Sequence, residues 1–139
     1  MGSHATQEVS DITNPTLRLT LPLPPSCNHS HRNFTNKNGR RLRVPTKRAA
    51  DWTASARDIA YTAMCASSWT CPMGEKVIVE YTIWWPDRRR RDSANLEKLM
   101  LDALEGTCYD DDRWALPRCQ DFSYDKADPR VEVVVRRKE

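Results

Sequence analysis

The chain has 139 residues, a net charge of +3 and 39% hydrophobic residues, which allows one domain with a single hydrophobic core. No apolar run approaches membrane-spanning length and no secretory signal precedes the first predicted strand, so we expect no membrane partner and a cytoplasmic location. The five cysteines form no Cys-x-x-Cys pair, which argues against a disulfide framework and a zinc ribbon.

The amino-terminal third alternates between extended and irregular segments. Residues 1–15 lack apolar periodicity and are predicted to be a disordered tail that includes a cloning remnant, so the folded domain would span residues 16–139. Alternating leucines over residues 17–21 predict a half-buried strand, and the prolines that follow end it. Residues 28–37 are expected to form a polar loop before the Asn38-Gly39 turn.

The remaining pattern interleaves helices and strands. A short hairpin strand is predicted around residues 42–44, and apolar residues at spacings of three and four predict a helix over residues 47–67. Residues 76–85 are β-branched and aromatic, which predicts a strand. Alternating valines predict a last strand over residues 131–135, with a further short strand over 122–124. This order predicts a compact α+β domain with a mixed, mostly antiparallel sheet packed by two main helices.

A second helix, predicted over residues 93–104 and closed by Gly106, separates its apolar and polar side chains. At ~100° per residue, one side carries Leu96, Leu99, Met100 and Ala103, and another carries Asn95, Lys98 and Asp102. The first side would face the core, and the second would form a polar row that starts near Asp92. Leu101 lies outside the main apolar stripe and is a candidate for a subunit contact.

Four consecutive arginines, Arg88 to Arg91, stand directly before Asp92. Such a cluster favours an anionic partner, most commonly nucleic acid. The alternative is a solvated loop in which Asp92 merely caps the helix. Likewise, the run Asp110 to Asp112 is either a solvated turn or a group of metal ligands, and Asp110 is expected to be dispensable.

Asp92 and the Asp110–Asp112 run are candidate Mg²⁺ ligands for phosphodiester hydrolysis, because carboxylate-bound Mg²⁺ activates water and neutralises phosphate charge. The turn at Gly106 is expected to fold the Asp110–Asp112 run back toward Asp92. On the polar row, Lys98 would contact the scissile phosphate or orient the water, and Asp102, four residues on, would hold its ammonium group. An ordinary surface ion pair is the alternative for these two residues.

The same residues carry a resemblance to a known family. The run Pro86 to Asp92, followed by Asn95, Lys98 and the Asp110–Asp112 run, resembles the RusA family of Holliday junction resolvases. The segment Leu21 to Asn28, with Arg32 after it, resembles that family's opening signature, and the likeness extends from Leu17 to Val135. The resemblance implies a bacterial or phage-encoded homodimer that nicks four-way junctions symmetrically with Mg²⁺, for which Mn²⁺ can substitute.

Family roles carry over residue by residue. Asp92 matches the first metal-binding Asp, Lys98 the catalytic Lys and Asp112 the downstream acidic residue, with Asp111 as a further candidate ligand; Asn95 and Asp102 would support them. Ala94 stands where the family has a second Asp, which implies impaired cleavage through an engineered or natural change. The expected DNA contacts are Arg88, Arg89, Arg90, Arg91, Asn28, Arg32, Arg40, Arg41 and Lys47.

Ala94 also keeps other functions open. The main alternative is a protein of the same fold that binds branched DNA without cutting it, and a weaker one is an RNA- or flap-directed nuclease. Trp84, Trp85 and Trp114 are predicted to be core or dimer contacts rather than base-stacking platforms.

Overall fold

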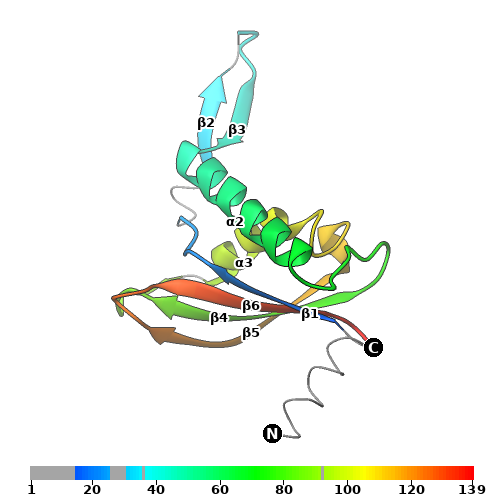
Figure 1. Ribbon diagram of the computed structural model, residues 1–139. Helices are drawn as coiled ribbons and strands as arrows, with labels where there is room; N and C mark the ends of the chain where they lie inside the picture. The colour runs from blue at the N-terminus through cyan, green and yellow to red at the C-terminus, as the bar shows by residue number, and fades with distance from the viewer. Residues whose placement is uncertain (1–14, 26–30, 36, 92) are drawn as a thin grey trace, which may run out of the picture.

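The computed structural model describes residues 15–25, 31–35, 37–91 and 93–139 (Figure 1). Residues 1–14 of the predicted tail over 1–15, as well as Asn28 and Asp92, lie outside these residues. In chain order the elements are β1 (Thr16–Leu21), β2 (His31–Thr35), β3 (Arg41–Pro45), α2 (Lys47–Cys65), β4 (Val77–Trp85), α3 (Ser93–Leu104), the short 3₁₀ helix η2 (Asp112–Trp114), β5 (Ala115–Tyr124) and β6 (Arg130–Arg137).

The main sheet has the strand order β1-β6-β4-β5. β6 pairs antiparallel with both β1 and β4, whereas β4 and β5 run parallel. Figure 1 shows α2 and α3 on the same side of this sheet. The predicted α+β class and the mixed, mostly antiparallel sheet are therefore confirmed.

Strand alternation decides which side chains the helices cover. Val131, Val133 and Val135 of β6 are buried, and each is the pairing partner of a buried residue of β1 and of β4. Their neighbours in the chain face the other side of the sheet, because successive strand residues point to opposite faces. β5 is much longer than the short strand predicted over 122–124. Pro117 and Arg118 interrupt the strand pattern in its first half, which hid that half in the sequence.

The β2–β3 hairpin stands apart from the sheet and projects beyond the start of α2 (Figure 1). The expectation of an irregular polar loop over 28–37 was wrong for residues 31–35, which pair in register with 41–45. Phe34 is the one apolar residue of this strand, so no apolar alternation reveals it. Only its pairing with residues 41–45 across the Asn38-Gly39 turn does. Gly39 has a φ of 76°, the conformation that the turn requires of glycine.

α2 is fixed at its start and along its buried side. Thr46 caps the helix, its Oγ1 accepting a hydrogen bond from the Ala49 N–H. Trp52 Nε1 donates to the Pro22 carbonyl at 2.9 Å, tying the helix to the end of β1. The helix ends at Cys65, two residues before the predicted end.

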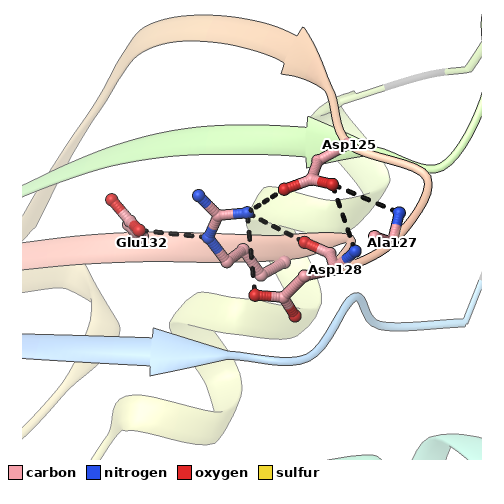
Figure 2. A network of polar contacts seen from close by, with 5 residues as sticks. Asp125, Ala127, Asp128 and Glu132 are labelled. Carbon is pink, nitrogen blue, oxygen red and sulfur yellow. Dashed lines mark hydrogen bonds and ion pairs between the residues drawn. The ribbon is translucent and has the colours of Figure 1, made fainter.

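The turn between β5 and β6 is organised by one arginine (Figure 2). Arg130 Nη1 donates to Asp125 Oδ2 at 2.9 Å and to the Asp128 carbonyl at 2.9 Å, and its Nε donates to Glu132 Oε1 at 3.1 Å. Its guanidinium also lies 4.3 Å from the centre of the Trp84 ring. The hydrogen bond from Arg130 lowers the pKa of Asp125, and two backbone N–H groups of the turn add to this effect.

We expect Arg130→Ala to lower the thermal midpoint of unfolding by several degrees, because the turn loses its shared donor and Asp125 keeps a negative charge without its partner. Arg130→Lys should recover only part of the loss, since an ammonium cannot reproduce the guanidinium fork. Differential scanning fluorimetry measures these changes. Arg118→Ala, at an exposed position of β5, is the control, and an equal loss there would contradict the role of Arg130.

Candidate active site and nucleic-acid interface

The rotation of α3 about its axis determines which of its side chains reach solvent. Leu96, Met100, Ala103 and Leu104 are buried. Tyr81 of β4 reaches the helix as well, donating its hydroxyl hydrogen to Glu97 Oε1 at 3.1 Å, and burial together with the Glu97 charge raises the pKa of Tyr81. With this rotation fixed, Asn95, Lys98 and Asp102 follow one another along the helix at spacings of three and four, and Glu105, the first residue after the helix, continues this spacing; we call these four residues the polar row.

Three carboxylates gather where the polar row ends. Oxygen atoms of Glu105, Asp111 and Asp112 all lie within 4.8 Å of one another, and we call these residues the acidic cluster. The Asp112 N–H donates to Glu105 Oε1 at 3.2 Å, which joins the loop to the helix. Sequence reasoning missed Glu105, although it continues the spacing of Lys98 and Asp102 by three residues.

The carboxyl groups of the acidic cluster differ in pKa. The Arg113 N–H donates to Asp111 Oδ1 at 3.0 Å and lowers the pKa of Asp111. Partial desolvation raises the pKa of Asp112, and the hydrogen bond with Asp111 and the negative charges of Glu105 and Asp102 raise it further. The Asp112 side chain is exposed, so a cation can reach it. A bound cation would reverse the part of this pKa rise that comes from the neighbouring negative charges.

The loop that carries the acidic cluster is anchored by buried groups. Tyr109 is fully buried, and its hydroxyl donates to the Leu101 carbonyl. Gly106, with a φ of 94°, closes α3 as predicted, and its N–H donates to the Tyr109 carbonyl at 2.7 Å. Asp110 Oδ2 accepts from the Gly74 N–H at 3.0 Å, so its oxygen holds a neighbouring loop rather than joining the acidic cluster.

The acidic cluster lies at the end of α3, not at its start. We expected the Gly106 turn to fold the Asp110–Asp112 run back toward the residues around position 92. Instead, Ala115 pairs with Val77 at the start of β4, while α3 begins after the end of β4. A helix of 12 residues separates the two regions, a distance of about 18 Å at ~1.5 Å per residue. The parallel pairing of β4 and β5 imposes this separation.

The four arginines of the run before α3 have different environments. Arg91 Nη1 donates to Asp87 Oδ1 at 2.6 Å, and its guanidinium lies 5.2 Å from the Trp85 ring centre. Arg88 lies 4.5 Å from the ring centre of Tyr124. The hydrogen bond from Arg91, with the Arg89 N–H, lowers the pKa of Asp87 to about 2.

Arg89 and Arg90 are exposed, and within the described part of the chain neither guanidinium has an ion-pair partner. Arg91 therefore stabilises the loop, whereas Arg89 and Arg90 present their charge to solvent. Four consecutive arginines in the sequence do not show which of them are paired. Asp87, four residues before Arg91, was the signal that could have predicted the pairing of Arg91.

The other predicted site residues occupy three regions. Lys98 and Asp102 are exposed on α3, and no ion pair joins these two described residues. Ala94 is exposed in the first turn of the same helix. Lys47 begins α2, and Arg40 is exposed beside the hairpin turn, with Arg32 on β2 and Arg41 on β3.

Three of the five tryptophans lie at the boundary between the core and solvent. Trp84, Trp85 and Trp114 are half-buried, and each has a guanidinium over its ring. Phe122 and Tyr124, by contrast, are exposed on β5. Sequence reasoning did not assign a function to these two aromatic residues.

This α+β domain carries an arginine-rich loop at one end of a charged helix and a carboxylate cluster at the other. Positive charge for a phosphate backbone beside carboxylates for a cation is the arrangement that a nuclease needs. A comparison with protein families supports this class: the family described as endodeoxyribonuclease RusA matches residues 22–136. The chain belongs to the RusA endodeoxyribonuclease family, whose members are nucleases that resolve Holliday junctions. A comparison with curated proteins gave no match. None of the described helices is long and apolar enough to cross a membrane.

We expect Arg89→Ala combined with Arg90→Ala to weaken junction binding and to reduce the slope of log affinity against log salt by about 2, because two phosphate contacts are lost. Fluorescence anisotropy at several salt concentrations measures this slope. Arg57→Ala, at an exposed position of α2, is the control. An unchanged slope in the double variant would mean that the two arginines form a solvated face.

Proposed function

We propose that this protein is a homodimeric, Mg²⁺-dependent endonuclease that binds four-way DNA junctions and makes paired, symmetric nicks in them. We further propose that Ala94 leaves binding intact and cleavage impaired. The family assignment supports a four-way junction as the substrate. The acidic cluster at the end of the polar row is the observation that supports metal binding.

The acidic cluster fits a hard divalent cation by its chemistry. All of its donors are carboxylate oxygens, which Mg²⁺ and Mn²⁺ prefer. At ~2.1 Å per bond, two oxygens on opposite sides of Mg²⁺ lie about 4.2 Å apart, close to the 4.8 Å limit within which the oxygens of Glu105, Asp111 and Asp112 fall. When bound, such an ion lowers the pKa of a coordinated water and neutralises phosphate charge.

We expect Mg²⁺ to raise the thermal midpoint of the protein, and Glu105→Gln to reduce that rise, because one negative ligand is lost while the acceptor for the Asp112 N–H is kept. Thermal unfolding over a Mg²⁺ titration measures the effect, with Ca²⁺ and added NaCl to separate binding from screening. Asp58→Asn, an exposed change on α2, should leave the rise intact. An equal rise in both variants would remove Glu105 from the ligand set.

The chain's own side chains divide the work on the substrate. Lys98 stands midway along the polar row, where its ammonium can contact a phosphate oxygen and stabilise the charge that develops during attack. Arg89 and Arg90 bind flanking phosphates and set the register of the DNA backbone along α3. Asn95 and Asp102 flank Lys98 on the same side of the helix and would orient it, with Asp102 as its electrostatic partner when DNA is bound.

Symmetry supports the homodimer. A four-way junction has two-fold symmetry, and two matched nicks need two copies of a site. The separation along α3 adds a second argument: position 94 and Asp112 lie too far apart within one subunit to contact the same ion. A two-fold contact between antiparallel α3 helices would bring the start of one helix beside the end of its partner. Leu101, half-buried against the core, could contribute only its remaining surface.

Ala94 is the observation that favours the second candidate function, binding of branched DNA without cleavage. It is exposed in the first turn of α3, so a larger polar side chain there would meet solvent rather than the core. An aspartate at position 94 is therefore compatible with the fold. A substitution there tests the role of a carboxylate in cleavage and leaves the packing of the core unchanged.

We expect Ala94→Asp to increase Mg²⁺-dependent nicking of a four-way junction by roughly 100-fold, with little change in junction affinity. Nicks made in both opposing strands during one binding event, followed on a supercoiled cruciform plasmid, would also report the homodimer. Ala94→Asn, which has nearly the same shape without the charge, is the matched control.

Two results would count against the proposal. Full cleavage by the chain with Ala94 would show that the metal ligands are assigned wrongly. A folded, junction-binding Ala94→Asp variant that remains inert would favour the non-cleaving function. Asp92→Asn and Lys98→Ala in the Ala94→Asp background should each abolish cleavage and keep binding.

A further inference from the structure

A cavity lies between the end of the sheet and the arginine-rich segment. It is lined by Ile83 and Trp85 of β4, by Phe122 and Tyr124 of β5, and by the run Arg88 to Arg91. Its volume is about 250 Å³, below the ~300–1,000 Å³ of pockets that hold drug-sized ligands. The space therefore suits one small group.

Two aromatic side chains at this cavity keep much of their surface exposed to solvent. Phe122 is 58% exposed and Tyr124 37% exposed. They pair in register with Ile83 and Trp85, so all four lie on the face of the sheet that bears the helices. Ile83 is fully buried there, whereas Phe122, on the edge strand, is left uncovered.

The charges around the cavity indicate what can cover these rings. Arg88 already lies against Tyr124 at 4.5 Å, so one guanidinium and one aromatic ring are stacked in advance. Phe122 and Tyr124 meet edge to face, with ring centres 6.5 Å apart and an angle of 89° between the planes, and more than half of the Phe122 side chain still reaches solvent. Arg89 and Arg90 place positive charge at the rim. A flat π-system attached to an anionic backbone satisfies both features.

We propose that this cavity binds a single unpaired nucleobase, stacked on Phe122 and held beside the Arg88–Tyr124 pair, while Arg89 and Arg90 bind its phosphates. The proposal deepens the proposed function, on which it rests for the source of the base: a nucleotide unstacked at the branch point of the junction. Single-stranded nucleic acid is recognised in this way, by aromatic platforms combined with basic grooves.

Phe122→Ala should weaken binding of a short single-stranded oligonucleotide by roughly 5- to 150-fold, the range for loss of one base–aromatic stack. The salt slope should stay unchanged because no phosphate contact is lost. Phe122→Trp should restore binding. Tyr61→Ala is the matched control, because Tyr61 is also 58% exposed but lies on α2. An oligonucleotide with 2-aminopurine at one position should be quenched on binding to the wild-type chain and not to Phe122→Ala.

The cysteines of the chain provide an independent footprint. Cys119 lines the cavity, and both it and Cys65, on α2, are exposed. Bound oligonucleotide should slow alkylation of Cys119, measured by peptide mass spectrometry, and leave Cys65 unaffected. Protection of neither cysteine, or of both equally, would overturn the assignment.

The outcomes separate this inference from the proposed function. Phe122-dependent binding of the single strand without junction binding would support the cavity and refute the junction. Junction binding and oligonucleotide binding that are both insensitive to Phe122→Ala would refute the cavity alone. A change from dimer to monomer in Phe122→Ala, seen by light scattering, with unaltered oligonucleotide affinity would assign Phe122 to a subunit contact and overturn the proposal.

Discussion

The packing of α3 against α2 and the sheet is the constraint on which the site depends. Leu96, Met100 and Ala103 are buried on one side of the helix, and the hydrogen bond from Tyr81 to Glu97 fixes its rotation from the sheet. A one-residue slip would turn the helix by ~100° and remove Lys98 from solvent at the cost of burying a charge. The apolar face thus determines the position of the polar row.

The parallel pairing of β4 and β5 imposes the second constraint. Because β5 starts beside Val77, the loop that precedes it must lie at the opposite end of the sheet from the arginine-rich segment. Tyr109 then fixes this loop by its buried ring and its hydrogen bond to Leu101. The two charged groups of the surface are therefore held at a separation that neither group can change alone.

The sequence was informative wherever a period was present. Alternating leucines and valines identified β1 and β6, and the spacing within residues 93–104 identified both faces of α3, because burial imposes the same period on structure and sequence. It was uninformative for β2 and for the first half of β5, where polar residues or Pro117 interrupt the pattern. It also placed the Asp110–Asp112 run at the wrong end of α3, since the register of a parallel pair depends on distant residues.

The dipole of α3 acts on the arginine run before the helix and on the acidic cluster at its end. The start of a helix carries partial positive charge and its end partial negative charge, each worth about 0.3–1 kcal/mol to a nearby charged side chain. The arginine run precedes the start of α3, and the acidic cluster lies at its end, so both charge groups are repelled by the helix as well as by their own members. Anionic phosphate at the first and a cation at the second would relieve both repulsions. In the proposed function, binding of a ligand of opposite charge at each end would recover the stability that this arrangement lacks in isolation.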